Sequence, residues 1–512
     1  MSLPSARSHA LASRVIHLYP AADACIAFHP TLLAVDILSS VVILVADGAR
    51  PETLAGAMAR GDLPALATLA REGSVATITA AFPSVTGVAY APFLVGRYPG
   101  PVGLPGLRWF DRTRTSRTFF GSSRSYVGAE MRLMDRDLSP DAPTIFELAP
   151  SSLGALSVIQ RGLPRAGRIG HGWPFVARTA LTHFRGDVMG WLDIDRTIGA
   201  TVVRRIRRER PAFTFAAFTG ADKTSHAHGH ASPMVIDALR IVDDCAAEIR
   251  RDAERDGRWG QMHLWVVSDH GHSPVQHHDD LATWARGLGL TTRSHPWVMS
   301  GFRRADIAVM PGGNAMAHLY LELARRTRPM WGDLAARWEP VVQALTARPS
   351  VDLVILTHSP TEFEVRSQSR GRARIEHRGD RYWYQPESGD PLGSGAVESA
   401  CQDEALEATL STDYPDAIVQ IANLAGSTRA GEVVVSANRT WDFRAHYEPI
   451  PHVSSHGALH RDHMLVPLLT SQPTARLPMR TVDVMPSALV ALGLPLPPLL
   501  DGRPFVVNRS GR

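Results

Sequence analysis

Three short runs of apolar residues stand out along the chain, and an acidic residue follows each of them closely. The runs are residues 41–46 before Asp47, residues 212–218 before Asp222 and residues 263–268 before Asp269. Runs that are apolar at successive positions are typical of strands buried on both faces of a parallel sheet. Helical patterns at residues 64–71 and 234–250 would supply the crossovers that such a sheet needs. Because ligands of open α/β sheets gather beyond the carboxyl ends of the strands, we expect the three aspartates to converge on one crevice.

The pattern changes between residues 311 and 430. Residues 351–357 form another strand-like run, and residues 363–384 alternate between residue types around Gly371 and Gly379, as small antiparallel hairpins do. We interpret 311–430 as a smaller α+β insertion or cap beside the main sheet.

The rest of the chain predicts an α/β core with a mostly parallel central sheet and helices on both faces. Its first part comprises residues 39–310, and residues 431–512 return to it, beginning with a strand at 431–436. Residues 481–493 predict a capped amphipathic helix that ends at a glycine. We interpret residues 1–38 as an N-terminal extension.

The composition narrows the chemistry that this core can carry. Of the 512 residues, 44% are hydrophobic and 20% are charged, as in a soluble globular protein. The three cysteines, Cys25, Cys245 and Cys401, are far apart, which excludes a disulfide framework and a cysteine-rich zinc module. The chain has 22 histidines, so any transition metal must be bound through imidazole and carboxylate groups.

Charge and hydropathy indicate which partners to expect. The formal net charge is +4, and Lys223 is the one lysine in a chain whose positive charge is otherwise carried by arginine. This small excess is compatible with a small phosphate-bearing substrate and does not require a nucleic acid polymer. No run reaches about 18 apolar residues, so we expect no membrane span. The N-terminus lacks the order of a signal peptide, so we expect a cytoplasmic protein, and the oligomeric state stays open.

Acidic and histidine residues in four segments form a candidate site for a pair of metal ions. Asp47 follows the first strand, Asp222 and His226 are spaced as Asp-x-x-x-His, Asp269 and His270 are adjacent, and His456 lies near the C-terminus. Three carboxylates and three imidazoles suit two divalent, zinc-like ions with mixed nitrogen and oxygen ligands. Each pair is a weak signal by itself, and the combination is much stronger.

Seven further histidines lie close to these segments in the sequence. We expect them to occupy loop or structural positions, or to contact the metal ligands, rather than to bind metal directly. They are His228, His230, His272, His277, His278, His460 and His463.

One hydroxyl group is a candidate nucleophile. Thr86 precedes Gly87 and an apolar helical run, residues 88–95, that closes at Gly96. A hydroxyl at a helix N-terminus lies near unpaired N–H groups, which favour a phosphoryl group. Judged from the local sequence alone, a helix cap is the commoner role of threonine at such a position. Ser84, two residues before Thr86, is an alternative nucleophile.

The order of these elements matches a known pattern. It runs from an early strand with Asp47, through a Phe-Pro-x-x-Thr element that ends at Thr86, to Asp-x-x-x-His, Asp-His-Gly and a late Ser-His-Gly. This order resembles the alkaline phosphatase superfamily, and most closely its type I phosphodiesterase/nucleotide pyrophosphatase branch. The resemblance spans residues 41–505 and includes Tyr-Pro-Gly at 98–100 and Asp-Gly-Arg-Pro at 501–504.

The resemblance implies how the candidate residues divide between two zinc ions. Asp47, Asp269, His270 and Thr86 (as alkoxide) would bind one ion, and Asp222, His226 and His456 would bind the other. Thr86 would also attack phosphorus and form a phospho-threonine intermediate that water then hydrolyses. Two metal ions that clamp the attacking and leaving oxygens make this in-line displacement chemically coherent.

One position departs from the family pattern. Nucleotide pyrophosphatases of this branch carry asparagine three residues after the nucleophile, where its amide helps to bind a phosphate oxygen, and this chain has Ala89. Either another donor replaces that amide, such as the Gly87 backbone N–H, or the substrate differs from a nucleotide. We expect hydrolysis of phosphodiester or pyrophosphate bonds, with a phosphomonoesterase or phosphonate hydrolase as the alternative. A non-catalytic binding relative is less consistent, because all six expected metal positions are filled.

Overall fold

Two large sheets organise the part of the chain that the computed structural model describes. The described residues are 39–114, 123–294, 305–443, 450 and 452–506, so the predicted N-terminal extension, 1–38, lies outside them. One sheet has seven strands and the other has nine.

The seven-stranded sheet has the order β2-β21-β8-β1-β7-β5-β6. Its strands are β1 (Ser40–Ala46), β2 (Ser74–Thr79), β5 (Ser152–Ala155), β6 (Arg168–Ile169), β7 (Phe213–Phe218), β8 (Met262–Val267) and β21 (Leu465–Thr470). The strands from β8 to β6 are parallel, and β21 is antiparallel to both of its neighbours. The three predicted apolar strands are β1, β7 and β8, and they are adjacent in the sheet.

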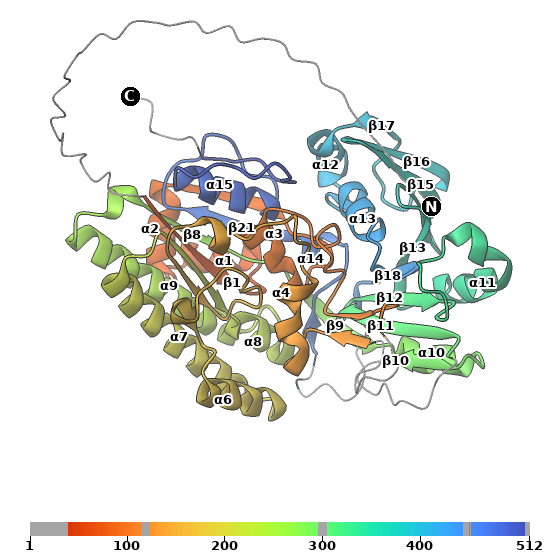
Figure 1. Ribbon diagram of the computed structural model, residues 1–512, viewed down its shortest axis with the longest axis horizontal. Coiled ribbons are helices and arrows are strands. Elements are labelled where there is room, and N and C mark those ends of the chain that lie inside the picture. Colours follow the sequence, from red (N-terminus) through yellow and green to blue (C-terminus); the bar gives the residue numbers. More distant parts are fainter. Residues whose placement is uncertain (1–38, 115–122, 295–304, 444–449, 451, 507–512) are drawn as a thin grey trace, which may run out of the picture. The chain divides into compact units, whose positions relative to one another are not determined.

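Helices cover both faces of this sheet, as the sequence predicts (Figure 1). Alternate residues of β1, from Val41 to Val45 and from Val42 to Ala46, enter two different hydrophobic cores. The first core includes α3 (Ala91–Val95) and α15 (Val484–Ala491), and the second includes α1 (Pro51–Ala59), α2 (Pro64–Glu72), α7 (Val188–Glu209) and α9 (Pro233–Arg255). Burial on both faces explains why the strand is apolar at every position from Val41 to Ala46.

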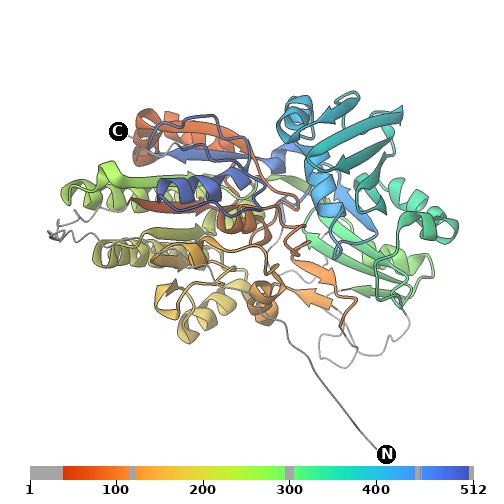
Figure 2. The same cartoon turned by 45° about the horizontal axis from the view of Figure 1, so that its top comes forward.

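The nine-stranded sheet has the order β10-β11-β12-β18-β13-β14-β15-β16-β17, and only β10 and β11 pair in parallel. The strands are β10 (Thr292–Ser294), β11 (Ile307–Gly313), β12 (Met316–Leu321), β13 (Val351–Ser359), β14 (Glu362–Ser367), β15 (Gly371–Arg378), β16 (Arg381–Gly389), β17 (Val397–Ala400) and β18 (Val433–Ala437). Helix α11 (Trp331–Thr346) packs on one face and α13 (Ala417–Ala425) on the other (Figure 2). The predicted fold class, a mostly parallel α/β core with a smaller α+β part, is confirmed.

Two local predictions are wrong. The strand expected at 431–436 to return to the central sheet is β18, which pairs with β12 and β13 in the nine-stranded sheet. Its valines pack into the cores on both faces of that sheet, so its apolar pattern suits either sheet equally well. The tail helix α15 is not amphipathic, because every residue except Val490 is buried. The domain boundaries themselves stay a prediction.

A third, three-stranded sheet joins segments that are far apart in the sequence. Its order is β19-β9-β20, in which β9 (Ser273–His278) is parallel to β19 (Thr440–Asp442) and antiparallel to β20 (Ser454–Ser455). Strand β9 begins shortly after His270, and β20 ends directly before His456. This pairing therefore carries the late histidine to the carboxyl end of β8.

Short elements complete the described chain. They are η1 (Val88–Tyr90), β3 (Arg108–Phe110), β4 (Ser123–Ser125), η2 (Gly128–Leu133), α4 (Met134–Asp137), α5 (Ile145–Leu148), η3 (Arg165–Gly167), α6 (Trp173–Phe184), α8 (Gly220–His228), η4 (Trp259–Gln261), α10 (Leu281–Gly287), α12 (Gln402–Leu410), α14 (Arg461–Met464) and η5 (Thr481–Asp483). Within the described ranges, no helix has both the length and the apolar character needed to cross a bilayer. The cytoplasmic location stays a prediction.

Candidate active site

The ends of β1, β7 and β8 meet at one edge of the seven-stranded sheet, and each carries a predicted site residue. Asp47 follows β1 directly, and its N–H donates to Phe218 O at 3.0 Å, which continues the pairing with β7. Helix α8 begins just after β7 and carries Asp222 and His226 one turn apart. Because the strands are parallel neighbours, their carboxyl ends lie together, as the sequence predicts.

His456 reaches the same place from the opposite end of the chain. Strand β20 pairs with β9 through Ser455 and Ser273, which aligns His456 with the turn that carries His270. The His270 and His456 rings stack with centroids 3.6 Å apart and an interplanar angle of 9°.

The Thr86 hydroxyl points into this cluster. Thr86 Oγ1 donates to Asp47 Oδ1 at 3.1 Å and lies 3.0 Å from His270 Nε2. The following helical turn, η1, has Gly87 as its N-cap and no side-chain cap, so Thr86 does not serve as the helix cap. The alternative nucleophile, Ser84, donates its hydroxyl to Ala458 O at 3.1 Å and is held there by that bond.

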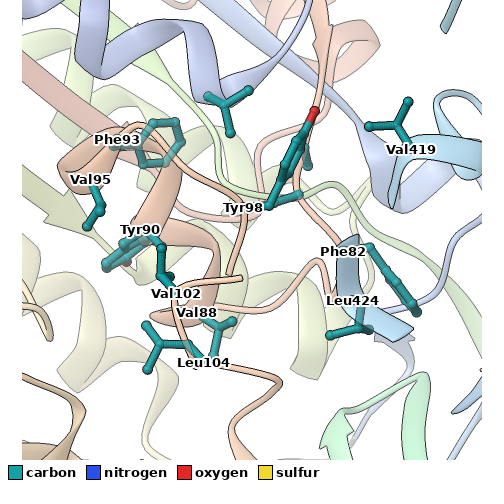
Figure 3. Packing of buried hydrophobic residues seen from close by; sticks show 14 of the residues in the cluster. Phe82, Val88, Tyr90, Phe93, Val95, Tyr98, Val102, Leu104, Val419 and Leu424 are labelled. Atoms are coloured by element: carbon teal, nitrogen blue, oxygen red, sulfur yellow. The ribbon is translucent and has the colours of Figure 1, made fainter. Parts of the chain in front are cut away.

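An apolar core anchors the segment that carries Thr86. Figure 3 shows Phe82, Tyr90 and Leu424 of α13 among the side chains of this core. The Phe82 N–H donates to Gln420 Oε1 of α13 at 2.8 Å. The backbone before Thr86 is thus fixed by a helix that packs on the nine-stranded sheet. That sheet therefore helps to position the Thr86 hydroxyl.

Three imidazole nitrogens face one oxygen of Asp222. Asp222 Oδ1 lies 3.2 Å from His226 Nε2, 3.4 Å from His456 Nε2 and 2.9 Å from His272 Nε2. The other oxygen, Oδ2, accepts a hydrogen bond of 2.6 Å from Lys223 Nζ.

Backbone carbonyls fix the tautomers of the three predicted histidines. His226 Nδ1 donates to Ser454 O at 2.8 Å, His270 Nδ1 to Gly271 O at 3.1 Å and His456 Nδ1 to Ser84 O at 2.9 Å. A carbonyl can only accept, so each Nδ1 carries a proton, which leaves Nε2 as the nitrogen that faces the cluster and can bind a metal ion. A hydrogen bond of this kind behind the ring is typical of histidines that bind metal ions.

Buried negative charge dominates the electrostatics of the cluster. Burial and the neighbouring Asp47 carboxylate raise the pKa of Asp269 well above its ordinary value, and within the described residues neither Asp269 oxygen has a hydrogen-bond partner. Burial opposes protonation of His270, but the Asp269 and Asp47 carboxylates outweigh it and raise its pKa to about 9. Burial likewise opposes ionisation of Asp222, yet Lys223 lowers its pKa well below the usual range. A cation between these groups would compensate the carboxylates.

Two overlapping groups of these residues could hold a metal ion. In each group one ligand atom per residue lies within 4.8 Å of all the others. The groups are Asp222, His226, His272 and His456, and Asp47, Asp222 and His270. Asp269 adjoins the second group, with Oδ2 3.6 Å from His270 Nε2.

The sequence reasoning missed two residues of the cluster. His272 was expected outside the metal ligands, but its buried ring contacts Asp222; burial lowers its pKa to about 3, so the ring is neutral at pH 7. Its spacing from His270 was the available signal, because residues two apart in extended backbone point to the same side. Lys223 was noted only as the single lysine. By contrast, His228 is exposed and lies outside both groups.

Comparisons with known proteins concern the family and the fold of the chain. A family model described as type I phosphodiesterase/nucleotide pyrophosphatase matches residues 41–459. The sequence matches none of the curated proteins. Among solved structures, a phosphonoacetate hydrolase from Sinorhizobium meliloti 1021 in complex with phosphonoformate is similar, with TM-score 0.54 and 14% identity over 89% of this chain and 96% of that one. Murine ectonucleotide pyrophosphatase/phosphodiesterase 5 in complex with AMP has TM-score 0.53 and 13% identity over 91% and 97% of the two chains.

Proposed function

Because the chain belongs to the type I phosphodiesterase/nucleotide pyrophosphatase family and is a hydrolytic enzyme, we propose that it cleaves a phosphodiester or pyrophosphate bond in a small phosphoester substrate. The observation that carries the proposal is the Thr86 hydroxyl, 3.1 Å from Asp47 Oδ1 and 3.0 Å from His270 Nε2. A hydroxyl turned from the helix start into a buried cluster of carboxylates and imidazoles suits a nucleophile.

The donor set around Thr86 fits divalent metal ions, most consistently zinc. Both oxygens of buried Asp269 lack hydrogen-bond partners among the described residues, and the neighbouring histidines turn Nε2, not Nδ1, toward the cluster. Carboxylate and imidazole are ligands that zinc prefers. In the proposal, one ion is held by Asp47, Asp269, His270 and Thr86, and the other by Asp222, His226 and His456. Bound there, two such ions would neutralise charge on the phosphoryl oxygens and acidify the attacking hydroxyl.

The chain's own residues bind and orient the reacting groups. Thr86 Oγ1 attacks phosphorus as the bond to the leaving oxygen breaks, which gives a phospho-threonine and releases an alcohol or a phosphate. Asp47 accepts the Thr86 hydrogen bond and so directs the oxygen lone pairs. Water then cleaves the phosphorus–Thr86 bond, which restores the hydroxyl and releases the phosphoryl product. Gly87 would donate its N–H to a phosphoryl oxygen, since that N–H has no acceptor among the described residues.

Ala89 favours a second candidate function, a phosphonate hydrolase or phosphomonoesterase at the same site. Ala89 is 1% exposed and offers no donor where family members carry asparagine. The phosphonoacetate hydrolase among the structural neighbours gives this alternative a precedent on the same fold. After cleavage, the phosphoryl group of a diester still carries one ester substituent, whereas that of a monoester carries none. Relative activity toward diesters and monoesters therefore distinguishes the two candidate functions.

The deciding experiment compares wild type with Thr86→Ala and Ser84→Ala. Each protein is assayed with bis-p-nitrophenyl phosphate, p-nitrophenyl phosphate and a nucleotide ester, and its metal content is measured. Thr86→Ala should lose more than about 10³-fold in kcat, because it removes the nucleophile itself. Ser84→Ala should retain turnover, because the Ser84 hydroxyl is used in a bond to Ala458 O. Acid-quenched wild type should carry a phosphoryl group that Thr86→Ala lacks.

The possible results separate the hypotheses. Full activity in Thr86→Ala, or no bound divalent metal in active wild type, contradicts the mechanism. A strong preference for the monoester or for a phosphonate selects the second candidate instead.

A further inference from the structure

His272 lies where a metal ligand would lie, although its position in the sequence did not suggest it. Its ring is fully buried, and its Nε2 atom is 2.9 Å from Asp222 Oδ1. The Nε2 atoms of His226 and His456 approach the same oxygen, at 3.2 and 3.4 Å. Three imidazoles from three separate segments thus converge on one carboxylate oxygen.

The hydrogen bonds of Ser454 fix the tautomer of His272. Ser454 Oγ donates its single proton to Ser273 O at 2.9 Å, so toward His272 Nδ1, 3.2 Å away, it can only accept. Nδ1 therefore carries the ring proton, and Nε2 presents a lone pair to Asp222 Oδ1. Two lone pairs at 2.9 Å repel each other, and a cation between them turns that repulsion into attraction.

The surroundings of the ring are shaped to keep it there. A Cβ atom on Gly48 would lie 2.8 Å from both Cδ2 and Nε2 of His272, so the ring packs directly on the glycine backbone. Nearby His463 provides a contrast, because both of its nitrogens have partners: Ala458 N–H donates to Nδ1 at 3.0 Å, and Nε2 lies 2.8 Å from Ser273 Oγ. His463 has no lone pair left for a metal, whereas His272 has one.

We propose that His272 is a fourth protein ligand of the metal ion held by Asp222, His226 and His456. This inference rests on the proposed function, which supplies the metal site. Three imidazoles and one carboxylate are ligands that suit zinc, which can take a phosphoryl oxygen as a fifth ligand during catalysis. The site that contains Asp47 has one imidazole and is richer in oxygen ligands. The imidazole-rich site therefore fills first when zinc is limiting and releases zinc last to a chelator.

The test uses the full chain, stripped of metal and given one equivalent of zinc. X-ray absorption should count three imidazole ligands in wild type and two in His272→Gln. A count of two in wild type, or of one because the other site fills first, overturns the proposal. This measurement needs only the wild-type protein, so it holds even if the variant folds poorly.

Affinity provides an independent readout with a matched control. Loss of groups behind metal ligands costs about 10–100-fold in affinity, so loss of a ligand itself should cost His272→Gln more than about 100-fold for the first zinc. His228→Gln replaces an exposed histidine on α8 and should bind zinc like wild type. Wild-type affinity in His272→Gln overturns this inference alone. Failure of wild type to bind any divalent metal overturns the proposed function as well.

Discussion

Replacing Gly48 with alanine should force His272 away from Asp222. Gly48 has φ +75°, and an alanine there adopts the left-handed conformation at a cost of about 1–2 kcal/mol. The new Cβ would also lie 2.8 Å from two atoms of the buried His272 ring. The ring must move, which weakens its hydrogen bond with Ser454 at about 0.5–1.5 kcal/mol. The total destabilisation is roughly 1.5–3.5 kcal/mol.

The measurement is the thermal midpoint of the metal-free protein. An unfolding entropy of about 2.1 cal/mol/K per residue, over 512 residues, gives about 1 kcal/mol per kelvin, so the midpoint of Gly48→Ala should fall by about 1.5–3.5 °C. Gly257→Ala is the matched control, because Gly257 has φ +67° and open space around the missing Cβ. Its midpoint should fall by only about 1–2 °C, because this variant has the cost of the left-handed conformation without the steric clash.

The steric reasoning is refuted if the two variants have the same midpoint. Zinc titration extends the comparison to the site. Gly48→Ala should bind the first zinc more weakly than wild type, while Gly257→Ala should bind it equally well. If Gly48→Ala is destabilised but binds zinc like wild type, the ring moves without serving as a ligand.

Three further results are expected. Burial opposes ionisation of Asp442, but hydrogen bonds from His278 and His452 lower its pKa to about 2. The ionised carboxylate therefore contributes about 2 kcal/mol to the free energy of unfolding. This contribution is complete above about pH 4 and is lost as the pH falls toward 2. Asp442→Asn should therefore flatten the acid side of a urea-denaturation profile, and an unchanged slope would contradict this account. Arg480→Met should cost about 3–5 kcal/mol, because it leaves fully buried Asp416 without the guanidinium 2.8 Å away. Adding Asp416→Leu should recover part of that loss in a double-mutant cycle. Dialysis against a chelator should abolish hydrolysis, zinc should restore it, and activity that survives complete metal removal would contradict the metal site.

The strands that position the site could be predicted because each is buried on both faces. That burial makes β1, β7 and β8 apolar at nearly every position, and their parallel order makes the residues after them neighbours. The same signal failed for β18, which is equally apolar. An apolar run indicates that a strand is buried on both faces. Hydrogen bonding to β12 and β13 determines which sheet contains β18, and the local sequence does not encode these partners.

Local sequence also misjudges residues whose role depends on distant partners. Thr86 has the sequence setting of a helix cap, yet its hydroxyl bonds to Asp47, 39 residues earlier in the chain. His272 follows a turn and resembles a loop residue, yet Ser454 fixes its tautomer from 182 residues away. In both cases the deciding contact spans the fold, so spacing alone cannot supply it.

Lys223 gives a physical reason for assigning Asp222 to the imidazole group. Asp222 belongs to both candidate ligand groups, so its carboxylate could in principle bridge two ions. Lys223 Nζ already binds Oδ2 at 2.6 Å, which leaves Oδ1 as the oxygen that faces the three Nε2 atoms. An ammonium group on Oδ2 also disfavours a second cation at that oxygen. The single lysine of the chain thereby favours one-oxygen binding by Asp222 and keeps the two proposed metal sites distinct.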